Sequence, residues 1–226
     1  MDLMKRYAVY YAPPAGEFWD RASHWLGRDA VTGADLVPPD LGLEAAALTR
    51  DPRRYGFHGT VKPPFRLADG AALPALHDAM ADLCARLAPV QMLGLRLANL
   101  HGFLALVPKG DTAPLAALAA EVVKGLDGFR APLTAEEIAR RRPERLSLRQ
   151  RELLYQWGYP HVMEEFRFHL TLTDRLAEPL AKQAAAILSA HFAPVLPQPF
   201  GIDSLCLFGE CQDGLFRLIH RYTLSG

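Results

Sequence analysis

The stretch that decides the fold is Phe166-Arg167-Phe168-His169-Leu170-Thr171-Leu172-Thr173. Its apolar and polar residues alternate, which is the two-residue period of a β-strand with one side in a core and the other in solvent. We therefore predict a strand over residues 166–173. Its solvent face would carry His169 and Thr171, supported by the positive charge of Arg167 and the hydroxyl of Thr173, a combination suited to an anionic ligand.

A similar stretch lies upstream, at residues 57–65, with the sequence FHGTVKPPF. The same period places His58, Thr60 and Lys62 on one face of a second predicted strand, and we expect Lys62 to lie near a bound phosphate. Pro63-Pro64 is expected to end this strand, because proline cannot donate a hydrogen bond to a neighbouring strand.

The chain contains an internal repeat that begins at each of these strands. In both copies the strand is followed by a helical pattern, at residues 71–87 and 177–192, and then by two strands around a tight turn. The turn glycine lies 44 positions after His58 in the first copy and 45 positions after His169 in the second. Matching order and spacing indicate a duplicated β-α-β-β unit.

The repeat predicts an α+β fold with two pseudo-symmetric lobes. Antiparallel sheets would face a central cleft, with the two His-x-Thr strands opposite each other and the helices outside. The whole chain, residues 1–226, is predicted to form a single bilobal domain. Lobe 1 covers about residues 1–128, two inserted helices cover about 129–160, and lobe 2 covers about 161–226.

Three local patterns complete this prediction. Residues 6–12 are β-branched and aromatic and predict a first strand, from which Tyr7 and Tyr11 could line the pocket. Residues 17–26 predict a helix that ends at Gly27. The inserted region contains three consecutive arginines, residues 140–142, which we interpret as a solvated helix end, with a binding rim as the alternative.

Composition restricts the classes of function. Lys+Arg and Asp+Glu both number 25, so the net charge is zero and does not favour strong binding of nucleic acid or an anionic membrane. The three cysteines are too few and too widely spaced for a disulfide framework or a structural zinc site. No apolar run is long enough to cross a membrane. We expect a cytoplasmic monomer that needs no metal or other cofactor.

Two histidines and two threonines around one site indicate acid–base chemistry. Histidine titrates near neutral pH, so one imidazole can accept a proton while the other donates one. Each such role typically contributes about 10²–10⁴ in rate. Threonine hydroxyls can donate hydrogen bonds to the oxygens of a phosphoryl group. A single His-x-Thr strand would suggest only an exposed sheet face, but two at the same place in a repeat indicate a site.

The two motifs, His58-Gly59-Thr60-Val61 and His169-Leu170-Thr171-Leu172, resemble those of the two-histidine (2H) phosphoesterase superfamily, which includes the bacterial 2′-5′ RNA ligase and cyclic nucleotide phosphodiesterases. The longer strings at residues 55–65 and 157–173 resemble a branch described as phosphonate-metabolism proteins. The resemblance implies a bilobal α+β fold, metal-independent phosphodiester chemistry, and active-site roles for His58, Thr60, His169 and Thr171.

Two classes of function stay open at this point. The first is a phosphodiesterase that hydrolyses a small or nucleotide-like substrate, for which a 2′,3′-cyclic phosphate is one candidate. The second is a binding module that holds a phosphorylated metabolite or an RNA end without turnover. Ligase-like activity on RNA is a weaker third candidate because the charge is balanced. The near-symmetry of the repeat leaves open which histidine is the base.

Overall fold

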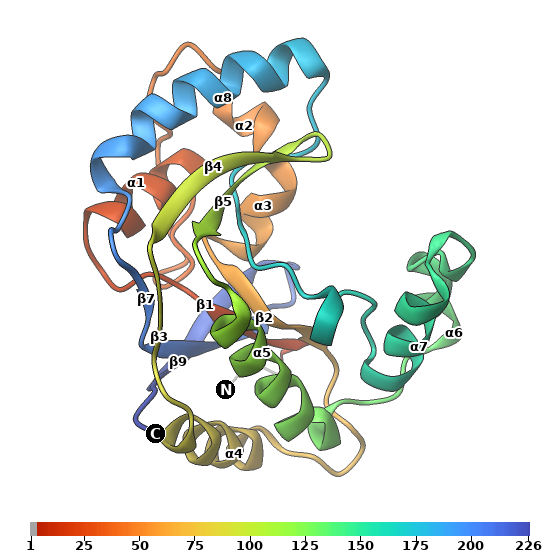
Figure 1. Ribbon diagram of the computed structural model, residues 1–226. Coiled ribbons are helices and arrows are strands. Elements are labelled where there is room, and N and C mark those ends of the chain that lie inside the picture. Colours follow the sequence, from red (N-terminus) through yellow and green to blue (C-terminus); the bar gives the residue numbers. More distant parts are fainter. Residues whose placement is uncertain (1–3) are drawn as a thin grey trace.

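The computed structural model describes residues 4–226 (Figure 1). Its elements are, in chain order, β1 (Tyr7–Tyr11), α1 (Glu17–Leu26), α2 (Ala45–Leu48), α3 (Arg50–Tyr55), β2 (Gly59–Phe65), α4 (Leu73–Arg86), β3 (Val90–Met92), β4 (Gly94–Leu100), β5 (Phe103–Lys109), α5 (Ala113–Gly125), α6 (Ala135–Arg140), α7 (Leu148–Trp157), β6 (Leu170–Thr171), α8 (Glu178–Phe192), β7 (Phe200–Ile202), β8 (Ser204–Glu210) and β9 (Phe216–Thr223). Short 3₁₀ turns cover Asp127–Phe129, Pro143–Arg145, Met163–Glu165 and Ala193–Val195.

Seven strands form one antiparallel sheet in the order β4-β5-β6-β2-β1-β8-β9, and β3 and β7 pair separately. The predicted α+β class and the duplication are confirmed, since β2-α4-β3-β4-β5 and β6-α8-β7-β8-β9 repeat one order of elements. The two halves join at the pair β2–β6. The two His-x-Thr strands are therefore neighbours in one sheet, where the sequence had suggested strands that face each other.

The two repeat units are intertwined. Hairpin β4–β5 of the first unit pairs with β6 of the second, and α8 packs on β4 and β5, while α4 packs on β9 of the second unit. In Figure 1, α8 accordingly lies over β4 and β5, and α4 lies at the opposite end of the molecule. Each half of the sheet therefore takes strands from both units, so the predicted lobe limits near residues 128 and 161 do not separate the two halves.

The strand predicted over residues 166–173 is much shorter in the structure. Only Leu170–Thr171 is a strand, and within the described chain β2 and β6 are joined at the single residue pair Gly59↔Leu170. The ring of Phe168 lies directly over Gly59, where a β-carbon would come within 2.2 Å of the ring. The glycine therefore leaves space for a large buried side chain at the junction of the two halves.

Strand β2, in contrast, is longer than predicted. It continues through Pro63 and Pro64 to Phe65, which pairs with Tyr7 of β1. The short β6 does not extend along this part of β2, so one side of it has no strand partner. On the β1 side the register shifts between the pairs Val9↔Lys62 and Tyr7↔Phe65, and proline is tolerated at such edges and bulges. The expectation that the prolines end the strand is wrong for this reason.

The predicted inserted helices are present as α6 and α7, and both begin with a capping box. Thr134 accepts from the backbone N–H of Glu137 and Ser147 from that of Gln150, and each partner side chain bonds back to the cap. Figure 1 shows both helices set to one side of the sheet. Helix α1 also has its predicted limits and ends at Gly27, in a left-handed conformation. Over residues 4–226, no helix is both long and apolar enough to span a bilayer.

Candidate active site

The β2–β6 pair brings together two histidines and two threonines. Continued one step to either side of Gly59↔Leu170, the antiparallel register would place His58 across from Thr171 and Thr60 across from His169. Opposed residues share a face of the sheet, with β-carbons about 4.5–5.5 Å apart. We call these four residues the His-Thr cluster. One residue pair thus assembles the cluster from positions more than a hundred residues apart in the sequence.

Both histidines are held in the same way. Nδ1 of His58 lies 2.9 Å from the carbonyl oxygen of Gly56, and Nδ1 of His169 lies 2.8 Å from that of Arg167. A carbonyl oxygen can only accept, so each Nδ1 carries the proton and donates it. Each Nε2 is therefore left as a proton acceptor, and in the free protein Nε2 of His58 accepts from the hydroxyl of Thr60, whose Oγ1 lies 3.3 Å away.

His58 is surrounded by aromatic rings. The ring of Tyr10 lies 3.9 Å from the imidazole and that of Tyr55 lies 5.8 Å from it, measured between centroids. Desolvation lowers the pKa of His58 to about 4, and repulsion from His169 adds to the effect, although the bond to Gly56 opposes it. His58 is therefore a neutral imidazole at pH 7 in the free protein.

A cavity of about 350 Å³ opens beside the cluster, and we call it the histidine cavity. Its wall includes His58, Thr60, Thr171, Tyr10, Tyr55, Phe103, Tyr159, Arg6 and Arg141. His169 is outside this wall, but its ring lies 5.6 Å from that of Phe103. Three of the four cluster residues therefore line one concave space, and the fourth lies next to its wall.

Tyr7 and Tyr11 do not line this cavity, so that expectation is wrong. Both are buried, and Tyr11 packs against Phe168 and Phe200 in the core. Tyr10 pairs with Thr60 across β1 and β2 and lines the cavity instead. The alternation of side chains along β1 puts residues 7 and 11 on one face and residue 10 on the other.

Lys62 does not lie on the face of β2 that carries Thr60, so its predicted position is also wrong. Thr60 pairs with Tyr10 and Lys62 with Val9, so two steps along β2 match one step along β1. This β-bulge turns Lys62 away from the face that carries Thr60. Its side chain is 2% exposed, and Nζ lies 3.1 Å from the carbonyl oxygen of Val123 and 3.8 Å from Asp127.

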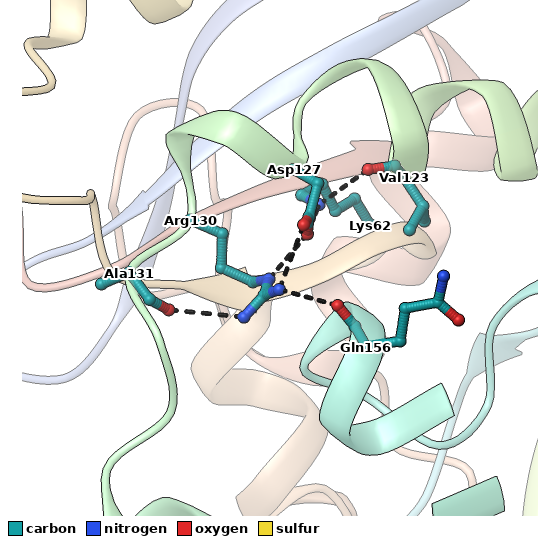
Figure 2. A network of polar contacts seen from close by, with 6 residues as sticks. All are labelled: Lys62, Val123, Asp127, Arg130, Ala131 and Gln156. Carbon is teal, nitrogen blue, oxygen red and sulfur yellow. Dashed lines mark hydrogen bonds and ion pairs between the residues drawn. The ribbon is translucent and has the colours of Figure 1, made fainter. Parts of the chain in front are cut away.

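Lys62 belongs to a structural network (Figure 2). Asp127 also binds Arg130, whose guanidinium reaches the backbone carbonyl oxygen of Gln156 in α7. Burial lowers the pKa of Lys62 to about 8, while Asp127 opposes this shift. The network therefore ties the central strand β2 to the end of α5 and to α7.

Replacing Lys62 by methionine is expected to reduce stability more than activity. The change leaves the Val123 carbonyl without this donor, which we expect to cost about 1–3 kcal/mol of unfolding free energy. We expect kcat/KM to fall by less than about tenfold, against the larger loss expected for a catalytic histidine. Urea unfolding and steady-state kinetics measure the two effects. A folded variant that is as inactive as one lacking His58 or His169 would instead support the prediction that Lys62 lies near a bound phosphate.

Arg167 does not contribute its charge to the histidine cavity. Its side chain is exposed and donates to the backbone carbonyl oxygens of Glu164 and Phe166, while its own carbonyl holds His169. The predicted support from Thr173 is also limited, because its hydroxyl accepts from the N–H of Leu104 and donates to the carbonyl oxygen of Asp174. Arg167 positions His169 through its backbone.

The sequence prediction missed several residues of the wall. Tyr55 lies just before the predicted strand at residues 57–65, and Arg6 is the first residue of the predicted strand at residues 6–12. Arg141 and Tyr159 come from the inserted region. The signal for Arg141 was the arginine run at residues 140–142, for which a binding rim was the alternative interpretation. Arg141 lies over the ring of Tyr159, 4.6 Å from its centroid. The inserted region therefore contributes directly to the cavity.

Solved structures that resemble this chain include Escherichia coli LigT complexed with 3′-AMP and TT0787 of Thermus thermophilus. The first is 14% identical with a TM-score of 0.44, and the second is 16% identical with a TM-score of 0.48. In both comparisons the alignment covers 98% of this chain and 98% of the other.

Two curated relatives carry the name ribose 1,5-bisphosphate phosphokinase PhnN. The relative from Janthinobacterium sp. (strain Marseille) is 38% identical over 94% of this chain and 49% of its own length. The relative from Laribacter hongkongensis (strain HLHK9) is 41% identical over 94% of this chain and 50% of its own length. The chain thus spans about half the length of these relatives. A family model described as "Protein of unknown function (DUF1045)" matches residues 60–217, and the chain belongs to this family.

Proposed function

We propose that this protein is a metal-independent phosphodiesterase that hydrolyses a small or nucleotide-like phosphodiester, with a 2′,3′-cyclic phosphate as the first candidate. The observation that supports this most is the His-Thr cluster. Two imidazoles, each anchored through Nδ1 to a carbonyl oxygen, offer Nε2 for proton transfer beside two hydroxyls. This set provides a base, an acid and hydrogen-bond donors for a phosphoryl group.

In the proposed mechanism His58 is the base and His169 is the acid. The lowered pKa of His58 keeps its Nε2 free to take a proton from water as the water oxygen attacks phosphorus. Protonated His169 gives its proton to the ester oxygen as the bond from phosphorus to that oxygen breaks. The products are a phosphomonoester and an alcohol, and for a cyclic substrate both groups stay on one molecule.

The threonines would act on the oxygens that are not transferred. Thr60 and Thr171 line the cavity on either side of the strand junction. When substrate binds, the Thr60 hydroxyl would turn from Nε2 of His58 to the phosphoryl group, so that both hydroxyls donate to non-bridging oxygens. These bonds strengthen as negative charge grows on those oxygens. The threonines would therefore stabilise the transition state more than the bound substrate.

The name of the curated relatives adds a sugar phosphate to the candidate substrates. We do not extend the kinase activity to this chain, which spans half of those proteins and contains no G-x-x-x-x-G-K-[ST] motif. A role in phosphonate metabolism, suggested by the sequence resemblance, belongs to the same proposal. So do a monomeric state, a cytoplasmic location and the absence of strong nucleic-acid binding.

A panel of cyclic and linear phosphodiesters tests the proposal. We expect release of a phosphomonoester from at least one cyclic substrate, unchanged after treatment with a chelator, and none with a variant that lacks both histidines. Loss of activity on chelation would indicate a metal enzyme. Tight binding without turnover across the panel would favour the alternative, a non-catalytic module for phosphorylated metabolites or RNA ends.

Stability should depend on His58 at acidic pH. The pKa of His58 is about 4 in the folded protein and near 6.5 when unfolded, so the unfolded chain binds the proton first as the pH falls. The contribution of neutral His58 is complete above pH 6.5 and is lost as the pH falls towards 4.

The measurement is urea unfolding between pH 4 and 7.5 for the wild type and for His58→Gln. The variant should lose stability less steeply over this range. The comparison is necessary because the pKa values of His77, His161 and His191 are also lowered. Identical pH dependence in the two proteins would contradict the assignment of a neutral, desolvated His58.

A further inference from the structure

A second cavity adjoins the histidine cavity. It has a volume of about 300 Å³ and shares with the first a wall formed by Arg6, Tyr55, Pro63, Pro64 and Arg141. Its other basic residues are Arg54, Lys62, Arg66, Arg130 and Arg140. The one carboxylate in this wall is that of Glu137, among the residues that the structure describes. We call this space the arginine cavity.

Part of this positive charge is neutralised by neighbouring carboxylates. Arg6 pairs with Glu210 at 2.5 Å and Arg66 with Glu137 at 3.0 Å. Asp127 serves both Arg130 and Lys62. Four of the seven basic side chains in this wall are therefore paired with a carboxylate.

Arg54, Arg140 and Arg141 make no ion pair with any carboxylate within residues 4–226. Arg141 is half-buried, and its guanidinium lies over the ring of Tyr159. A stacked guanidinium keeps its edge N–H groups available, and those groups match the oxygens of a phosphate. Arg141 is also the one of these three that lines both cavities.

The helices that carry this wall are fixed to the sheet. The pair Arg66–Glu137 attaches α6 to the end of β2, and the network of Figure 2 attaches α7 through Arg130 and Gln156. Binding an anion at Arg141 therefore requires little reordering of the inserted region, which favours affinity.

We propose that the substrate carries a second anionic group, a phosphomonoester, which the arginine cavity binds through Arg141 with help from Arg54 and Arg140. The phosphodiester would lie at the His-Thr cluster and the second phosphate across the shared wall. The inference rests on the proposed function and narrows its substrate class to a pentose or nucleoside phosphodiester that bears a separate phosphate.

The test compares adenosine 2′,3′-cyclic phosphate with the same compound phosphorylated at its 5′ position. A charge-assisted bidentate contact of about 1.5–3 kcal/mol corresponds to a preference of roughly 10–10²-fold for the 5′-phosphorylated compound. We expect the wild type to show this preference in kcat/KM, mainly through a lower KM. Arg141→Gln should reduce the preference to near one, and Arg141→Lys should keep part of it.

Arg145→Gln is the matched control, because Arg145 is an exposed arginine of the inserted region that lines neither cavity. Its preference should equal that of the wild type. Equal kcat/KM for the two compounds in the wild type would overturn this inference while leaving the phosphodiesterase proposal in place.

Binding of both compounds to the His58→Ala, His169→Ala double variant, measured by calorimetry, separates the two proposals. If the wild type hydrolyses neither compound, the phosphodiesterase proposal loses support. Tighter binding of the 5′-phosphorylated compound that depends on Arg141 would still support the anion site. Equal binding of the two compounds would overturn it.

Discussion

Replacing either His58 or His169 by alanine is expected to lower kcat/KM by about 10²–10⁴-fold with the fold retained. The two rings sit at equivalent places of a duplicated unit, and each is held through Nδ1 by a backbone carbonyl oxygen, which leaves its Nε2 to exchange protons. Removing one ring removes either proton acceptance or proton donation. Steady-state kinetics on the substrate found in the panel measure the loss, and circular dichroism and thermal melting check the fold.

His24→Ala is the control, since His24 lies exposed on α1 and lines neither cavity. It should keep wild-type kinetics. The double variant should lose little more than the worse single variant, because the effects of residues that act together in one chemical step are not additive. If His58→Ala leaves a cavity that unfolds the protein, His58→Gln retains volume and serves instead. A folded single variant with near-wild-type kcat/KM would contradict the mechanism.

Replacing Gly59 by alanine is expected to impair both stability and activity. The new β-carbon would lie 2.2 Å from Cζ and 2.5 Å from Cε2 of Phe168. Phe168 is 6% exposed and packs against Tyr11 and Phe200, so its ring has little room to move. Overpacking of this kind typically costs about 1–3 kcal/mol. Any shift of Phe168 is passed to the adjacent His169, and a misplacement near 1 Å can cost about 10²-fold in rate.

Gly201→Ala provides a matched control in another strand. A β-carbon on Gly201 of β7 meets only the carbonyl oxygen of Val90, at 4.0 Å, so neither stability nor rate should change appreciably. Adding Phe168→Leu to Gly59→Ala should recover part of the lost stability, because the shorter side chain relieves the contact. Wild-type stability and kinetics in Gly59→Ala alone would show that Phe168 adapts freely.

The sequence alone determined the repeat and the residues of the proposed chemistry. The order strand, helix, strand, turn, strand could be predicted because periods of two and 3.6 residues, glycine turns and helix caps are local signals. The same local signals located α1, both inserted helices and the His-x-Thr motifs. They did not predict that Leu170–Thr171 alone would be a strand, because the hydrogen-bond partner of a strand lies elsewhere in the chain.

Only the tertiary structure decided which side chains share the site. A β-bulge between β1 and β2 places Lys62 in a buried network. The alternation of side chains along β1 places Tyr10, and not Tyr7 or Tyr11, in the wall of the histidine cavity. Arg141 lines the cavity because its helices are anchored by an ion pair and a hydrogen bond between residues far apart in the sequence. The physical reason is that a pattern of residues fixes the face of a strand only while its register is regular. Bulges, the pairing of a hairpin with a strand of the other repeat unit, and long-range ion pairs depend on contacts that exist only after the chain has folded.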